Sequence, residues 1–193
     1  MDERSYRRRI GSYIGAFCAL AVLAGSAQAQ VFNGLDGIAK RPFESAAHAR
    51  VFLFVRTDCP ISNRYAPELG RIAGEFKGRG VDFWLVYSDR SETRTNIERQ
   101  ISDYKLPGEP LLDPRQELAH RAEAAVSPQA AVFDHEGRLA YSGRIDDRFV
   151  DFGKSRPEAS THDLEAAITA TLQHKPVPHP RTQAIGCYLA DVE

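Results

Sequence analysis

Residues 51–62 read Val51-Phe-Leu-Phe-Val-Arg-Thr-Asp-Cys-Pro-Ile-Ser62. A continuous apolar run leads through a short polar turn to Cys59 and Pro60. Such a run is typical of a strand that is buried on both faces of a parallel sheet. Proline favours the first position of a helix, because its missing N–H would have no partner there in any case. We therefore expect a buried strand that is followed by a helix with Cys59 at its N-terminus.

This position predicts a reactive thiol at Cys59. Unpaired N–H groups and the helix dipole favour an anion at a helix N-terminus. A lowered thiol pKa makes the thiolate, which is the nucleophilic form, available at neutral pH. The alternative interpretation is a small buried cysteine that only fills the core.

The rest of the chain alternates between helical and extended patterns. Apolar residues recur at three- and four-residue steps up to about Lys77 and predict an amphipathic helix that bends at Pro67. A strand over residues 81–87 follows, then a helix from about Thr95 and an extended piece at 108–113.

Pro114 is expected to open another helix, and a hairpin turns at residues 134–137 before a last helix that ends near Gln173. The order predicts an α/β fold with a central mixed sheet flanked by helices, in which parallel strands are joined by crossovers and one edge is antiparallel. Ligands and chemistry gather at the carboxyl ends of parallel strands, which is where Cys59 lies.

The longer stretch Thr57-Asp-Cys-Pro-Ile-Ser-Asn-Arg-Tyr-Ala-Pro-Glu-Leu69 resembles the active-site turn of the thioredoxin-like superfamily, and in particular its redoxin (AhpC/TSA-like) branch from bacterial envelopes. The resemblance covers roughly residues 51–173 and implies the thioredoxin-like fold. Ser62 stands where a dithiol thioredoxin has its second cysteine. That difference argues against ordinary dithiol exchange, because no neighbouring thiol can release a mixed disulfide.

The resemblance also implies roles for other residues. Pro128 would follow a cis peptide bond beside the reactive cysteine, and the Ser127 backbone would pair with an extended substrate; a trans proline in a connecting turn is the alternative. Peroxiredoxins usually have a threonine three residues before their reactive cysteine, whereas Thr57 is two before Cys59.

Topology predicts that residues 143–156 border the same site. There Arg144 or Arg148 can stabilise a thiolate or polarise a peroxide, and Asp146 or Asp147 can hold the arginine in place. The alternative is a charged loop in solvent.

Cys187 lies in a tail after the last helix. The tail can span roughly 43 Å when extended, and the helix carries the chain only about 20 Å away, so that Cys187 can return to Cys59. We expect a resolving thiol, which attacks an oxidised Cys59. A thiol for a metal or partner, and an inert residue, are the alternatives.

Residues 1–29 have the pattern of a signal peptide. A basic segment from Arg4 to Arg9 precedes the apolar stretch Ile10–Ala24, and Ala27-Gln-Ala29 is a cleavage motif. We expect cleavage after Ala29 and a periplasmic or secreted protein without stable membrane insertion, a retained anchor being the alternative. Residues 30–174 would form the redoxin domain, and residues 175–193 the tail.

These patterns predict an exported thiol-dependent oxidoreductase that acts by thiol–disulfide exchange or by peroxide reduction. Its expected partners are a protein thiol or disulfide, or a peroxide, and an external reductant. No cofactor or metal is expected, since the six histidines show no metal-ligand spacing, and a net charge of −1 gives no indication of a nucleic-acid partner. A redoxin-fold module that binds a metal or partner without turnover, and a structural protein tied by a Cys59–Cys187 bridge, are the competing hypotheses.

Overall fold

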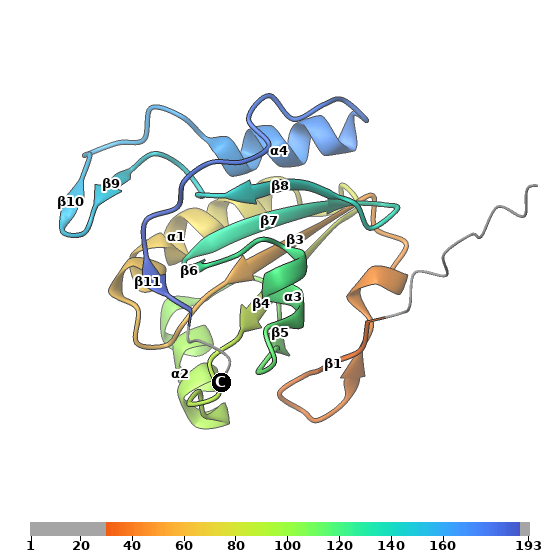
Figure 1. The fold of residues 1–193 in the computed structure, drawn as a ribbon, viewed down its shortest axis with the longest axis vertical. Helices are drawn as coiled ribbons and strands as arrows, with labels where there is room; N and C mark the ends of the chain where they lie inside the picture. Colours follow the sequence, from red (N-terminus) through yellow and green to blue (C-terminus); the bar gives the residue numbers. More distant parts are fainter. Residues whose placement is uncertain (1–29, 190–193) are drawn as a thin grey trace, which may run out of the picture.

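The computed structural model describes residues 30–189, which form a central sheet with helices on both faces (Figure 1). The sheet has seven strands in the order β2-β1-β5-β4-β3-β7-β8. These strands are β1 (Phe32–Asn33), β2 (Ala39–Lys40), β3 (Ala49–Phe54), β4 (Val81–Tyr87), β5 (Glu109–Leu112), β7 (Gln129–Asp134) and β8 (Leu139–Gly143). Strands β3, β4 and β5 are parallel, whereas β7 runs antiparallel to β3 and β8 antiparallel to β7.

Strand β3 lies inside the sheet, and its six residues are all buried. Its side chains alternate between two apolar layers, because successive residues of a strand point to opposite faces. Val51 and Leu53 pack in one layer, and Phe52 and Phe54 in the other. Burial on both faces explains why residues 51–55 are continuously apolar.

The helices divide between these two layers. Helices α1 (Pro60–Glu75), α2 (Arg94–Tyr104) and α4 (Asp163–Leu172) contribute buried side chains to the layer of Leu53. Helix α3 (Glu117–Arg121) and the short 3-10 helix η1 (Pro42–Glu44) pack in the layer of Phe52.

Two further short strand pairings lie outside the main sheet. Strands β9 (Phe149–Asp151) and β10 (Lys154–Ser155) form a hairpin that projects from the body of the molecule (Figure 1). Strand β11 (Cys187–Tyr188) pairs antiparallel with β6 (Val126–Ser127). The tail therefore returns to the body of the protein.

The predicted thioredoxin-like fold with a mixed sheet is confirmed. One boundary prediction was wrong: α3 begins at Glu117 and not at Pro114, because residues 114–116 form a turn in which Gln116 has a φ of 55°. The predicted signal peptide lies outside the described residues, and within residues 30–189 no helix is long and apolar enough to cross a membrane.

Candidate active site

Cys59 is the N-cap residue of α1, and Pro60 occupies the first helical position, as the sequence predicted. The Cys59 carbonyl accepts the first helical hydrogen bond, from the Asn63 N–H at 3.2 Å. The residue has no exposed surface. The sulfur is thus held at the positive end of a helix dipole and away from bulk water.

The peptide bond between Ser127 and Pro128 is cis, as the family resemblance implied. The Ser127 carbonyl accepts a hydrogen bond from the Cys59 thiol at 3.0 Å. The hydroxyls of Ser127 and Ser62 lie 2.7 Å apart, and both residues are fully buried. Ser62 therefore places a hydroxyl near the sulfur of Cys59.

Strand β11 brings the second thiol to the same place. In its antiparallel pairing with β6, Cys187 lies opposite Ser127. The side chains of Cys187 and Cys59 lie near enough that each affects the ionisation of the other. Both cysteines are free thiols in the structure. Two residues that are 128 positions apart in sequence thus meet at one backbone carbonyl.

The surroundings of Cys59 stabilise its thiolate. Burial alone would raise the pKa of Cys59, since it disfavours the charged form. Hydrogen bonds from the thiol and N–H of Cys187, and from the N–H and hydroxyl of Ser62, act in the opposite direction and lower that pKa below its ordinary value. The Ser127 carbonyl accepts a hydrogen bond from the protonated Cys59 thiol and therefore stabilises that form.

The pKa of Cys187 is shifted in the opposite direction. Burial raises its pKa, and the hydrogen bond to Cys59 and the negative charge of the Cys59 thiolate raise it further, to about 12. The nearby guanidinium of Arg56 lowers it only in part. Cys59 therefore ionises more readily than an ordinary thiol, whereas Cys187 keeps its proton at neutral pH.

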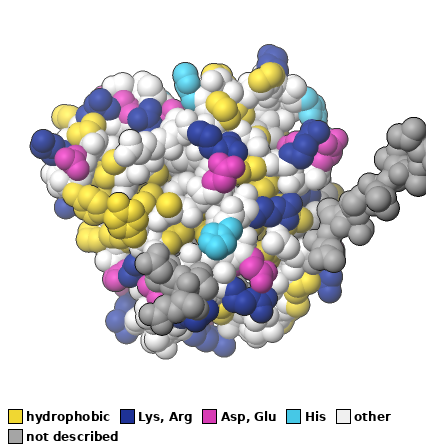
Figure 2. Space-filling view, viewed as in Figure 1, with side chains coloured by type: hydrophobic (Ala, Val, Ile, Leu, Met, Phe, Trp, Pro, Cys, Tyr) yellow, Lys and Arg dark blue, Asp and Glu magenta, His cyan; other side chains and the backbone are white. Residues whose placement is uncertain are grey.

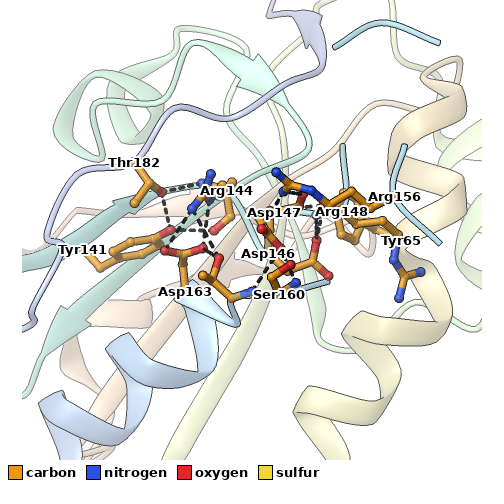
Figure 3. Close-up of polar contacts among 11 residues, drawn as sticks. Tyr65, Tyr141, Arg144, Asp146, Asp147, Arg148, Arg156, Ser160, Asp163 and Thr182 are labelled. Atoms are coloured by element: carbon orange, nitrogen blue, oxygen red, sulfur yellow. Dashed lines mark hydrogen bonds and ion pairs between the residues drawn. The ribbon is translucent and has the colours of Figure 1, made fainter. Parts of the chain in front are cut away.

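Two candidate residues make their contacts elsewhere. The Thr57 N–H and hydroxyl donate to the two carboxylate oxygens of Glu92, at 2.8 and 2.7 Å. Arg144 pairs with Asp163, with its Nε 2.8 Å from a carboxylate oxygen (Figure 3). The expected contact between Arg144 and Cys59 does not occur among the described hydrogen bonds and ion pairs.

Residues 146–148 form a separate group on the α1 side (Figure 3). Asp146 accepts a hydrogen bond from the Tyr65 hydroxyl at 2.6 Å, and Asp147 pairs with Arg156. The first contact holds the loop after β8 against α1, and the second joins this loop to the residue that follows β10. The predicted border of charged residues is thus largely a set of internal ion pairs.

Sequence reasoning missed Arg56, which lies between β3 and Cys59. Its guanidinium donates to the Tyr188 carbonyl at 2.8 Å and pairs with Asp58 and Asp89. It therefore anchors β11 and brings positive charge to Cys187. Without knowledge that the tail returns here, the sequence offers no signal that distinguishes Arg56 from other arginines.

A group with metal-ligand geometry lies away from the cysteines. Glu68, His162 and Glu165 are close enough to one another to hold an ion. The Arg71 guanidinium already bridges the two carboxylates, which makes this group an ion-pair network.

Comparisons with known proteins show which family and which solved structures this chain is similar to. Residues 33–142 match the model of the AhpC/TSA family. A search of curated proteins found no match. Two solved structures with 26% sequence identity have TM-scores of 0.70: an uncharacterized conserved protein from Geobacillus kaustophilus, which covers 86% of this chain and 90% of its own, and a hypothetical protein from Sinorhizobium meliloti 1021, which covers 83% and 89%.

More distant structures share the fold. A putative thiol:disulfide interchange protein DsbE from Chlorobium tepidum is 16% identical with a TM-score of 0.57, and it covers 74% of this chain and 92% of its own. A secreted Mycobacterium tuberculosis disulfide oxidoreductase is 16% identical with a TM-score of 0.53, covering 76% and 96%. The family match spans more than half of the chain, and the fold agrees with it. The chain belongs to the AhpC/TSA family of thioredoxin-like redoxins.

Proposed function

We propose that this protein is an exported thiol-dependent oxidoreductase in which Cys59 is the nucleophile and Cys187 the resolving thiol. The observation that carries the proposal is the pairing of β11 with β6, which puts Cys187 opposite Ser127, the residue whose carbonyl binds the Cys59 thiol. An exported location rests on the predicted signal peptide, and the secreted disulfide oxidoreductase with this fold is consistent with it.

The first step uses the Cys59 thiolate. With a hydroperoxide, sulfur attacks one oxygen, the O–O bond breaks, and the departing oxygen takes a proton, which leaves a sulfenic acid on Cys59. With a disulfide, sulfur attacks one substrate sulfur and releases the other as a thiolate, which leaves a mixed disulfide. Either product has lost the negative charge of Cys59.

That loss activates Cys187. Two of the effects that raise the Cys187 pKa are the hydrogen bond to Cys59 and the charge on Cys59, and both end when Cys59 reacts. Arg56 remains and favours the Cys187 thiolate. Cys187 then attacks the Cys59 sulfur, forms the Cys59–Cys187 disulfide and releases water or the second substrate thiol. An external dithiol reduces the disulfide and is itself oxidised.

Ser62 supports this chemistry in the place of a second active-site cysteine. Its N–H and hydroxyl both stabilise the Cys59 thiolate, and its hydroxyl also contacts the hydroxyl of Ser127. The thiol that would complete a local dithiol pair is supplied by β11.

The test compares turnover of hydrogen peroxide and of oxidised glutathione, with dithiothreitol as the reductant, in the parent protein and in Cys59→Ser and Cys187→Ser. We expect Cys59→Ser to abolish turnover. Cys187→Ser should stop Cys59–Cys187 disulfide formation and leave Cys59 as a sulfenic acid or mixed disulfide that only the added thiol can resolve. The proposal fails if Cys59→Ser retains the parent rate with both substrates. Whichever oxidant supports turnover identifies the substrate class.

A further inference from the structure

The tail occupies the strand edge next to the reactive thiol. β6 offers main-chain groups on which an extended segment can pair by strand addition. In this structure the segment on that edge belongs to the chain itself, since Cys187 and Tyr188 of β11 pair with Ser127 and Val126. The β6 edge is therefore already occupied by a segment of the same chain.

Gly186 makes this close approach possible. A Cβ at Gly186 would lie 2.1 Å from the Ser127 carbonyl oxygen and 2.6 Å from the carbonyl carbon. Both atoms belong to the backbone of β6, so that neither can move away as the end of a flexible side chain could. A residue without a side chain is needed for the tail to reach Ser127.

The tail is anchored on both sides of Cys187. Upstream, the Thr182 N–H donates to the Ser142 carbonyl at 3.2 Å. Downstream, the Leu189 N–H donates to the Ala125 carbonyl at 2.9 Å, and the Leu189 side chain is buried in the α3 layer. These contacts fix β11 over the site.

The two thiols differ in access to solvent. Cys59 has no exposed surface, whereas Cys187 is partly exposed and its neighbour Tyr188 is 77% exposed. Hydrophobic side chains gather on the surface around β11 (Figure 2). A large reactant that comes from this side meets the tail before it meets Cys59.

We infer that β11 is a size filter for Cys59: small oxidants reach the sulfur past the docked tail, whereas an extended polypeptide reaches it only after β11 leaves the β6 edge. The inference rests on the proposed function, because it takes Cys59 as the reacting thiol. While β11 is paired with β6, the substrates that can reach Cys59 are hydroperoxides and other small oxidants. Gly186 is the residue that determines this specificity.

The test uses two maleimides with the same reactive group, N-methylmaleimide and a polyethylene-glycol maleimide. The parent for this test is the full chain with Cys18→Ser and Cys187→Ser, in which Cys59 is the one remaining cysteine. The thiolate adds across the maleimide double bond without any redox partner, so the readout does not depend on turnover.

We expect the ratio of the small-reagent rate to the large-reagent rate to fall by about tenfold or more in Gly186→Ala, because the added Cβ clashes with Ser127 and makes the tail easier to open. Leu189→Ala should lower the ratio in the same direction from the other end of β11, without altering the contact at Ser127. Gly74→Ala is the matched control, since nothing lies within 4 Å of a Cβ at that helical position.

Equal ratios in the parent, Gly186→Ala and Leu189→Ala would overturn the size filter, provided that circular dichroism shows the variants folded. If Gly186→Ala does not fold, the ratio of the two maleimide rates in Leu189→Ala tests the size filter by itself. A Cys59 that reacts with neither reagent in any variant would overturn the proposed function, and the filter with it.

Discussion

At the scale of single residues, the site depends on hydrogen bonds to one sulfur. Ser62 and Cys187 donate to Cys59, and their combined effect exceeds the burial that would raise its pKa. A donor to an ionised group stabilises the charged form more strongly than a neutral hydrogen bond does. Removing either donor should therefore be visible in the pH dependence of the thiol.

Ser62→Ala should slow the alkylation of Cys59 by iodoacetamide about tenfold at pH 7, which corresponds to one charge-assisted hydrogen bond of about 1.5 kcal/mol. The thiolate fraction increases with pH, so a higher pKa moves the rate profile to higher pH. Ser155→Ala, at an exposed position on β10, is the control. An unchanged profile for Ser62→Ala would mean that its hydroxyl does not stabilise the thiolate.

Cys187→Ala removes the second donor, and we expect it to raise the pKa of Cys59 as well. Cys187→Ser keeps a hydroxyl donor at the same place and should retain most of the effect. The measurement is the alkylation rate of Cys59 between pH 5 and pH 10, read by mass spectrometry of the Cys59 peptide. Identical profiles for the alanine and serine variants would contradict a hydrogen bond between the two side chains.

At the scale of elements, α1 and the loop after β8 are joined by Tyr65 and Asp146. The Tyr65 hydroxyl donates to Asp146 at 2.6 Å, and burial raises the pKa of Tyr65, so it stays protonated as the donor. The other carboxylate oxygen of Asp146 is buried without a partner among the described residues. This carboxylate therefore depends on Tyr65 and on the Arg148 N–H.

Tyr65→Phe should lower the free energy of unfolding by about 1–3 kcal/mol, because it leaves a buried carboxylate with one partner fewer. Urea denaturation measures this change. Tyr104→Phe, at a half-exposed position on α2, should stay within about 0.5 kcal/mol of the parent protein. A Tyr65→Phe protein as stable as this control would show that the contact does not hold the loop.

The sequence predicted the elements whose local pattern is strong. The apolar run of β3 and the position of Cys59 before Pro60 were both read from adjacent residues, and the structure agrees with them. The contacts of Arg144 and Arg56 were not predicted, because ion pairing depends on which carboxylates the completed fold brings near each guanidinium. The reach of the tail was predicted from length, whereas the pairing of β11 with β6 has no local signal in a two-residue strand.

At the scale of the whole molecule, the proposed disulfide would join the start of the domain's first long helix to its tail. A bridge between Cys59 and Cys187 would close a loop of 128 residues. A loop of that length restricts the unfolded chain, which stabilises the folded state by roughly 3–5 kcal/mol in the chain-entropy description.

The oxidised protein should therefore unfold at a higher temperature than the reduced protein, and the difference should vanish in Cys187→Ser. Differential scanning calorimetry with and without dithiothreitol measures it. Ser62→Ala, which keeps both cysteines, should retain the difference. Equal melting temperatures for the two redox states of the parent protein would argue against a bridge that links the tail to the domain.

Peptide mapping after oxidation shows whether Cys59 and Cys187 act as a redox pair. One equivalent of hydrogen peroxide accepts two electrons from the two thiols, and the products are one disulfide and two waters. We predict a rapid loss of both thiols and one linked peptide that contains Cys59 and Cys187. A Cys59 that stays a free thiol, or that accumulates as sulfinic acid while Cys187 remains free, would show that the two cysteines do not act as a redox pair.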